Sequence, residues 1–135
     1  MEKPTCDEVM EVYKKTFELM RESAKKEDLE DVSEEFETLC IEFKDCGKKF
    51  CIAISDEGEM SILEEPLANP DCTITTDVGT MHDLAMGTTN EVKAYLSGKI
   101  KIAGVSPLKI QKLLPKLGPL DECYKKALEE VQGED

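Results

Sequence analysis

Six cysteines are the residues of this chain with the widest range of possible chemistry. No two of them form a Cys-x-x-Cys pair, and their spacing matches no common zinc pattern. Because no secretion signal is apparent at the start of the sequence, we expect reduced thiols with a structural role. Two alternatives stay open, namely disulfides, as in some hyperthermophile cytosolic proteins, and a metal site. The cysteines are Cys6, Cys40, Cys46, Cys51, Cys72 and Cys123.

The single histidine, His82, is followed by Asp83, a pair of residue types that acid–base catalysts use. Neighbouring residues of a helix do not face each other, so we expect His82 at the surface or in a helix cap. Consecutive carboxylates such as Glu34 and Glu35 also point to different faces, and no calcium loop is present. No serine nucleophile elbow and no phosphate-binding glycine loop is found. We therefore expect no catalytic residues, no metal and no cofactor, and a protein that is not an enzyme.

Charge is distributed unevenly along the chain. The 135 residues include 17 basic and 30 acidic ones, a net charge of -13, and no Trp. Repulsion from phosphate backbones and the scarcity of aromatic side chains argue against nucleic-acid binding. From Lys93 to Lys116, however, the chain has six lysines and no acidic residue, beside many apolar side chains. Such a segment suits a lipid, a membrane surface or a protein partner, and the alternative is a solvated lysine face on a core strand and helix.

Length and hydropathy indicate one domain over residues 1–135. Hydrophobic residues make up 40% of the chain, enough for a real core. No apolar run approaches the roughly 20 residues that span a bilayer. With no signal peptide apparent, we expect a soluble protein in the cytoplasm.

The first part of the chain predicts a helix over residues 5–26. Thr5-x-x-Glu8 has the pattern of a capping box, and apolar residues recur on one face. Residues 27–35 are interpreted as an acidic connector. The apolar face comprises Val9, Tyr13, Phe17 and Met20.

Alternating segments on both sides of Cys46-Gly47 predict a β-hairpin. A two-residue turn at these positions pairs Phe43 with Phe50 and Ile41 with Ile52. Apolar side chains then share one face of the hairpin. That face comprises Leu39, Ile41, Phe43, Phe50, Ile52 and Ile54.

The remaining segments complete a sheet and its helices. A third strand over 59–63 extends the hairpin to a three-strand meander, and residues 72–76 and 99–103 are further strands. Short helices are expected at 80–85, 91–96 and 106–114, the last begun by Ser106-Pro107 and ended by Pro115. A final helix covers 119–132. This order predicts an α+β fold, a five-stranded, mostly antiparallel sheet with helices on one face.

Two of these segments carry a specific sequence pattern. Pro70-Asp-Cys-Thr-Ile-Thr75, followed at the expected distance by Tyr95-Leu-Ser-Gly-Lys-Ile-Lys-Ile-Ala-Gly104, resembles the sterol carrier protein type 2 family of nonspecific lipid-transfer proteins. The resemblance covers about residues 30–116. The chain departs from the family in lacking a peroxisomal address and in its additional helix over 119–132.

The resemblance implies a non-enzymatic carrier with an apolar tunnel between sheet and helices. Its ligand would be a fatty acid, a fatty acyl-CoA or another lipid, and lysines would contact an anionic head group or, transiently, an anionic membrane. Ten residues are the candidates for lipid contact: Met81, Leu84, Met86, Tyr95, Leu96, Ile102, Leu108, Leu113, Leu114 and Leu117. Five are the candidates for head-group or membrane contact: Lys99, Lys101, Lys109, Lys112 and Lys116.

The same fold allows a second function. If side chains fill the tunnel, the final helix and the surface of Leu108–Leu117 would instead bind a partner protein or a second copy of the chain. The protein would then be an interaction or dimerisation module.

Overall fold

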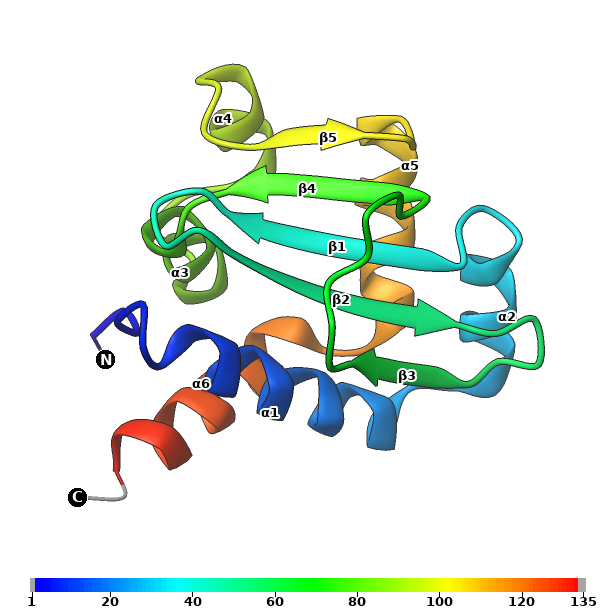
Figure 1. The fold of residues 1–135 in the computed structure, drawn as a ribbon, viewed down its shortest axis with the longest axis horizontal. Helices are drawn as coiled ribbons and strands as arrows, with labels where there is room; N and C mark the ends of the chain where they lie inside the picture. Colours follow the sequence, from blue (N-terminus) through cyan, green and yellow to red (C-terminus); the bar gives the residue numbers. More distant parts are fainter. Residues whose placement is uncertain (1, 134–135) are drawn as a thin grey trace.

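The structure, a computed structural model, describes residues 2–133 and contains a five-stranded sheet with helices on one face (Figure 1). The predicted α+β class and the mostly antiparallel sheet are confirmed. The strands are β1 (Thr38–Phe43), β2 (Lys48–Ile54), β3 (Met60–Leu63), β4 (Cys72–Thr76) and β5 (Lys101–Ala103). The helices are α1 (Val9–Ser23), α2 (Lys26–Ser33), α3 (Val78–Met86), α4 (Glu91–Leu96), α5 (Pro107–Leu113), the 3-10 helix η1 (Leu114–Leu117) and α6 (Leu120–Gln132).

The strand order is β3-β2-β1-β4-β5, which contains the predicted meander. β1 and β4 are parallel, whereas all other neighbouring strands are antiparallel. Because β4 lies beyond β1, the chain must cross two strands after β3. Residues 64–71 make this crossing over the face of the sheet opposite α5 (Figure 1). The Lys49 side chain donates a hydrogen bond to the Leu67 carbonyl, 2.8 Å away, which ties the crossing segment to β2.

The predicted register of the β1–β2 hairpin is wrong by two residues. Phe43 pairs with Lys48 and Ile41 with Phe50, so the loop has four residues, 44–47. The Cys46 N–H donates to the Phe43 carbonyl within this loop, and Gly47 has a positive φ of 64°. A shift of two leaves every side chain on its predicted face, because side chains alternate with a period of two.

The core lies where α1 and α6 pack under β1 and β2. The Tyr13 ring contacts those of Phe43 and Tyr124, with centroids 4.9 and 5.7 Å apart. Phe17 and Phe50 lie 5.2 Å apart in the same cluster. Figure 1 shows α1 and α6 side by side along the β2–β3 edge of the sheet. These aromatic side chains fill the space between helices and strands there.

The predicted capping box before α1 is confirmed, but residues 5–26 do not form one helix. The Thr5 hydroxyl accepts from the Glu8 N–H at 3.3 Å, and the Glu8 carboxylate accepts from the Thr5 N–H at 3.0 Å. Helix α1 ends at Ser23. The interpretation of residues 27–35 as a connector is wrong, because α2 occupies most of them. Leu29 and Val32, three residues apart, are buried, which gives this acidic helix the apolar contact it needs.

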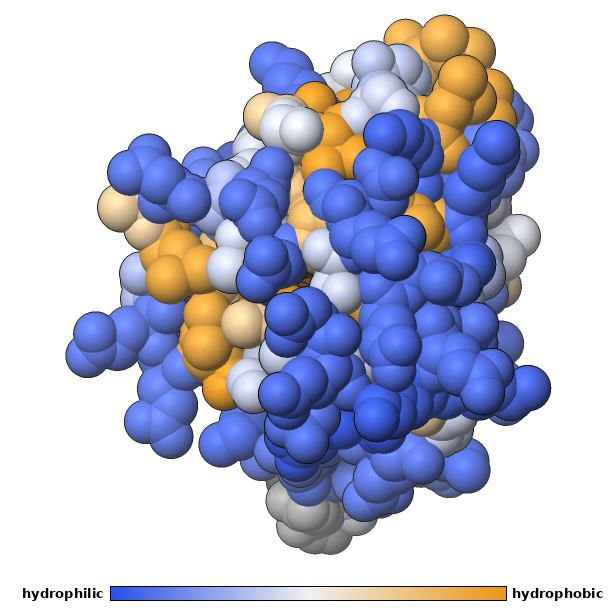
Figure 2. Space-filling view, turned by 90° about the vertical axis from the view of Figure 1, so that its right-hand side faces the viewer, coloured by the Kyte–Doolittle hydropathy of each residue, from blue (hydrophilic) through white to orange (hydrophobic). Residues whose placement is uncertain are grey.

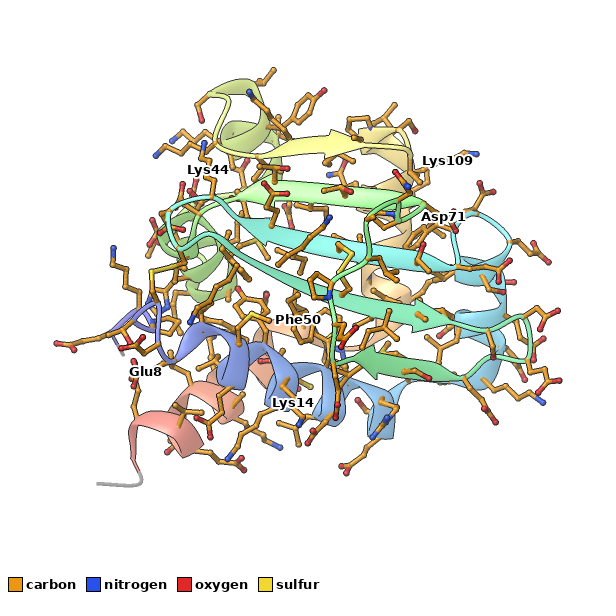
Figure 3. The ribbon with its side chains drawn as sticks, in the orientation of Figure 1. Glu8, Lys14, Lys44, Phe50, Asp71 and Lys109 are labelled. Atoms are coloured by element: carbon orange, nitrogen blue, oxygen red, sulfur yellow. A yellow bond between two sulfur atoms is a disulfide. The ribbon has the colours of Figure 1, made fainter. Side chains whose placement is uncertain are left out.

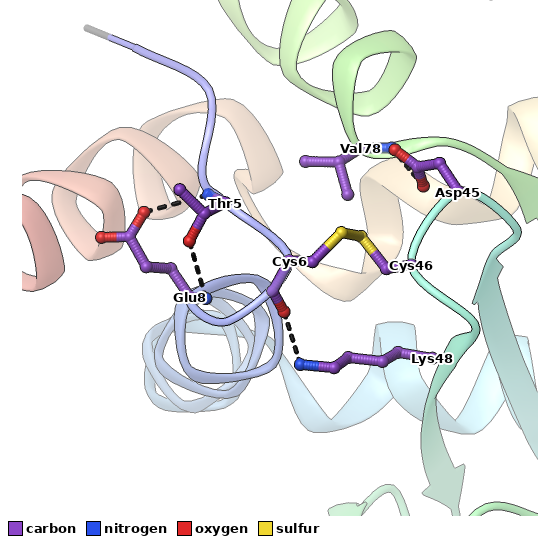
Figure 4. The surroundings of a disulfide bond; sticks show 7 residues. All are labelled: Thr5, Cys6, Glu8, Asp45, Cys46, Lys48 and Val78. Carbon is purple, nitrogen blue, oxygen red and sulfur yellow. Dashed lines mark hydrogen bonds between the residues drawn. A yellow bond between two sulfur atoms is a disulfide. The ribbon is translucent and has the colours of Figure 1, made fainter.

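Two disulfides, Cys6–Cys46 and Cys40–Cys51, are present (Figure 3). The expectation of reduced thiols is therefore wrong for these four cysteines. Cys40 and Cys51 lie directly opposite each other in β1 and β2. Figure 4 shows Cys6, just before α1, joined to the β1–β2 loop, where the Asp45 carboxylate accepts from the Val78 N–H. The spacing of the cysteines in the sequence does not reveal either bond, because each depends on which segments lie side by side in the fold.

The other two cysteines, Cys72 and Cys123, are buried thiols. Burial, together with the neighbouring charge of Asp71, raises the pKa of Cys72 to about 11. Burial also raises the pKa of Cys123. Because the thiolate is the reactive form, neither residue has the electrostatic environment of a cysteine nucleophile.

Candidate functional site

A cavity of about 460 Å³ lies between the β4–β5 part of the sheet and helices α3 to α6. Ile74 of β4 and Ile102 of β5 form part of its wall. Most of the other lining side chains are also apolar. They are Tyr13, Met81, Leu84, Ala85, Val92, Tyr95, Leu96, Ile100, Pro107, Leu108, Ile110, Leu114, Leu120 and Tyr124, and the remaining lining residues are Glu91, Ser106, Gln111 and Asp121.

The cavity has a buried end and an exposed end. Tyr13 and Tyr124 are each only 1% exposed, and they form its deep end next to the aromatic core. Leu96 is 79% exposed and Leu108 is 72% exposed, and they lie at its mouth on α4 and α5. Figure 2 shows one exposed apolar patch at the top of the molecule, the end at which α4, β5 and α5 lie in Figure 1, and further apolar atoms lower on its left side.

Side-chain caps fix the short helices around the cavity. The Asp77 carboxylate accepts from the Thr80 N–H at 2.7 Å, which starts α3. Asn90 and Ser106 cap α4 and α5 in the same way, as predicted. Gly87 ends α3 with a φ of 77°, in the left-handed region that favours glycine. Local sequence signals therefore set where each helical wall of the cavity begins.

Seven of the ten predicted lipid-contact residues line the cavity: Met81, Leu84, Tyr95, Leu96, Ile102, Leu108 and Leu114. The other three do not line it. Met86 lies at the end of α3, half-buried. Leu113 and Leu117 are buried in the core instead, where η1 packs against α2. On the same stretch of helix, Ile110 and Leu114 face the cavity.

Sequence reasoning missed much of the deep end. Ile74, Ile100 and Ile110 had visible signals, because each belongs to an apolar face recognised in the sequence. Tyr13 and Tyr124 also lie on apolar stripes, those of α1 and α6, but only the packing of these two helices brings them to the cavity.

The prediction of a surface or capping role for His82 is wrong. Its ring is 8% exposed, and Nδ1 lies 2.9 Å from the Tyr124 hydroxyl. The two rings make an edge contact with centroids 5.8 Å apart. His82 therefore faces α6 rather than solvent. Its hydrogen bond with Tyr124 satisfies a ring nitrogen that burial removes from water.

The five predicted head-group lysines fall into two groups. Lys109 forms an ion pair with Glu35 at 2.7 Å, and Lys116 forms one with Asp31 at 2.9 Å. The hydrogen bond to Asp31 raises the pKa of Lys116. Lys99, Lys101 and Lys112 are exposed, and no ion pair with another described residue holds them. Two lysines of the basic segment thus neutralise part of the acidic stretch around α2, and these three lysines stay exposed.

Across residues 2–133, no helix is long and apolar enough to cross a membrane. In the same residues, no group of three or more His, Cys, Asp and Glu side chains is arranged to hold a metal ion. The side chains that line the cavity offer apolar contact, three tyrosine hydroxyls and the exposed carboxylates of Glu91 and Asp121.

The family model of the SCP-2 sterol transfer family matches residues 14–132. This match extends beyond the segment of about 30–116 recognised in the sequence. It also includes α6, so the helix over 119–132 lies within the family match and is not an addition to it. Among curated protein sequences, none matches the chain.

Several solved structures share the fold. Sterol carrier protein 2 in one crystal structure has 14% identity and a TM-score of 0.53, over 85% of this chain and 94% of that chain. Sterol carrier protein 2 from Yarrowia lipolytica, in its apo form, has 18% identity and a TM-score of 0.50, over 82% and 88%. The sec-alkylsulfatase Pisa1 from Pseudomonas sp. has 16% identity and a TM-score of 0.60, but only 16% of its chain is covered by 76% of this one. At such identities the likeness concerns the fold alone.

Proposed function

The chain belongs to the SCP-2 sterol transfer family, and we propose on this basis that it is a carrier for one hydrophobic ligand. Family membership supports lipid binding or transfer in general. We propose further that a fatty acid, a fatty acyl-CoA or another lipid enters the cavity, and that the protein performs no catalysis on it. The observation that carries this proposal is the largely apolar cavity of about 460 Å³.

The size and walls of the cavity support this function. Small-molecule sites in proteins have volumes of about 300–1,000 Å³ and are mainly hydrophobic with a few polar groups. Burial of an acyl chain gains about 0.8 kcal/mol per methylene, so affinity increases with chain length. Unbranched Met81 can adapt to chains of different shape. The lipid-contact residues proposed here are the seven predicted ones that line the cavity, with Ile74, Ile100 and Ile110.

The mouth of the cavity suits contact with an anionic membrane. Leu96 and Leu108 expose apolar side chains beside exposed Lys99, Lys101 and Lys112. An apolar tip enters the acyl boundary of a bilayer, while lysines around it approach lipid phosphates. The net charge of -13 opposes this approach only weakly, because charges more than about 8 Å apart are largely screened at physiological salt. This local surface is proposed as the route by which cargo enters and leaves.

The alternative function, an interaction or dimerisation module, requires side chains to fill the space under β4 and β5. A cavity of about 460 Å³ in this place favours the carrier instead. The exposed Leu96 and Leu108 are the observation that favours the module. Lipid binding distinguishes the two functions, whereas oligomeric state alone does not, because a carrier binds lipid in its monomeric or dimeric form alike.

The direct test is to purify the protein under native conditions, extract it with organic solvent and analyse the extract by mass spectrometry. A stoichiometric lipid is expected, and it identifies the cargo class. If the extract is empty, titration of the delipidated protein with a fluorescent fatty acid follows. A dimer that binds no fatty acid in this titration would replace the carrier with the interaction module.

A further inference from the structure

Two tyrosine hydroxyls lie at the deep end of the cavity, away from its exposed mouth. Tyr13 comes from α1 and Tyr124 from α6, and their ring centroids are 5.7 Å apart. Both side chains are 1% exposed. Phenylalanine would fill the same space if the cavity held only hydrocarbon. A buried hydroxyl is unfavourable without a hydrogen-bond partner, so these two groups need an explanation.

The two hydroxyls differ in their partners. The Tyr124 hydroxyl lies 2.9 Å from Nδ1 of His82. Among the described residues, no hydrogen bond joins the Tyr13 hydroxyl to another group. Yet no side-chain oxygen or nitrogen in residues 2–133 is both sealed from solvent and unpaired. The Tyr13 hydroxyl is therefore open to the cavity that this residue lines.

Both hydroxyls keep their protons at neutral pH. Burial raises the pKa of Tyr13 well above its ordinary value, and the neighbouring Tyr124 raises it further. Burial raises the pKa of Tyr124, and so does the charge of Asp83. Protonated phenols can donate a hydrogen bond as well as accept one. The deep end of the cavity thus offers neutral donors rather than a charge.

The rim has the opposite character. Leu96 and Leu108 are the most exposed large apolar side chains at the mouth. The acidic residues that line the cavity, Glu91 and Asp121, are both exposed and therefore belong to the rim. A carboxylate head group left at this rim would stay among solvated charges, with Glu91 and Asp121 opposing the attraction of the nearby lysines. The same head group placed inside would meet hydroxyl donors.

We propose that the cargo is a single-chain lipid with one compact polar group, a carboxylic acid or an alcohol, bound with that group at Tyr13 and Tyr124. Its hydrocarbon end points toward the mouth between α4 and α5. This inference rests on the proposed carrier function and adds the class and orientation of the ligand. Lipids with two chains or a large phosphate head group do not fit this arrangement, because the head group site is enclosed.

The test compares three ligands of equal chain length: hexadecanoic acid, hexadecan-1-ol and hexadecane. Each is titrated against delipidated protein carrying diphenylhexatriene, an apolar fluorescent probe, and displacement is measured. The variants are Tyr13→Phe and Tyr124→Phe, with Tyr95→Phe as the comparison at the mouth. The control is Ser61→Ala, which removes an exposed hydroxyl on β3 outside the cavity lining. The effect of each variant is taken ligand by ligand, so that differences in aqueous solubility cancel.

Tyr13→Phe is expected to weaken the acid and the alcohol about tenfold and to leave hexadecane unchanged, because one hydrogen bond to the ligand is lost. Tyr124→Phe is expected to act in the same direction. Tyr95→Phe should not weaken the acid and the alcohol relative to hexadecane, and Ser61→Ala should change none of the three affinities. Tyr13→Phe removes no hydrogen bond within the described protein, so it carries the test even if loss of the His82 contact unfolds Tyr124→Phe.

Two results would overturn the inference while leaving the carrier intact. In one, Tyr13→Phe affects all three ligands equally or affects none. In the other, Tyr95→Phe selectively weakens the acid and alcohol, which would place the head group at the mouth. If none of the three ligands displaces the probe from the wild-type protein, the proposed function fails first, and the inference fails with it.

Discussion

The two halves of the sheet are covered in different ways. Under β1 and β2, aromatic rings from α1 pack against rings from the strands at centroid distances of 4.9 to 6.1 Å. Under β4 and β5, aliphatic side chains from short helices leave a cavity of about 460 Å³. The same sheet thus has a closed half and an open half.

The difference follows from helix length and side-chain type. Helix α1 has 15 residues and packs along its length against α6. Helices α4 and α5 have 6 and 7 residues, so each has only one or two turns for contact with the sheet. Both disulfides also join segments of the closed half, because Cys6, Cys40, Cys46 and Cys51 precede or lie within α1, β1 and β2. The closed half is thus the cross-linked frame of the sheet.

The largest expected contrast is in stability. Phe43→Ala removes a fully buried ring from the closed half and is expected to lower the free energy of unfolding by about 3–5 kcal/mol. Leu108→Ala, at the exposed mouth, should change it by less than about 0.5 kcal/mol. Urea unfolding measures the free energy of unfolding of both variants, and equal m-values make the two changes comparable. Equal losses in the two variants would show that the halves are not distinct.

Loss of a disulfide should be the next largest effect. Replacing Cys6 and Cys46 by serine is expected to cost about 2–4 kcal/mol, because a long loop of the unfolded chain is no longer closed. Fatty-acid affinity should change less than twofold, since neither residue lines the cavity. Calorimetric unfolding and probe displacement measure the two effects. A large loss of affinity would mean that the frame controls the shape of the open half.

Filling the cavity should have the opposite effect, a loss of affinity with little loss of stability. Ala85 is buried and lines the cavity, so the ring in Ala85→Phe occupies ligand space. We expect at least tenfold weaker binding of hexadecanoic acid, with a small change in melting temperature. Ala103→Phe makes the same substitution at an exposed site on β5 and serves as the control. Unchanged binding in Ala85→Phe would place the ligand outside this cavity.

The smallest effect is expected from the surface charge of the open half. The triple variant with glutamate at Lys99, Lys101 and Lys112 should slow transfer to anionic vesicles several-fold at low salt and little at high salt. The control reverses three exposed lysines elsewhere, Lys14, Lys44 and Lys125, for the same change in net charge. Equal slowing in both triple variants would indicate a general charge effect instead of a docking surface.

Sequence reasoning located elements better than contacts between them. Strand β4 and helix α4 were predicted with their observed bounds, because Pro70, Asn90 and Gly98 mark their ends locally. Helix α2 was missed because its charges outnumber its two buried residues. The pairs His82–Tyr124, Lys109–Glu35 and Lys116–Asp31 join positions 42, 74 and 85 residues apart, and no local pattern encodes them.

For the candidate site, too, local faces were predictable from the sequence and contacts between distant elements were not. The helix and strand faces around residues 81–114 supplied seven residues that line the cavity. The two tyrosines of the deep end depend on how α1 and α6 pack on each other, which the periodicity of either helix leaves open. Leu113 and Leu117 were assigned to the cavity because a helical wheel shows an apolar face without showing which neighbour it meets.

The bond between Cys40 and Cys51 has a consequence for how the hairpin finds its alignment. Two alignments of β1 and β2, two residues apart, bury the same apolar side chains, so burial alone discriminates poorly between them. In the shifted alignment Cys40 would face Ala53, and its sulfur would find no partner across the ladder. Oxidation therefore occurs in only one alignment and then makes it permanent. The disulfide therefore selects the observed register of the hairpin and disfavours the register shifted by two residues.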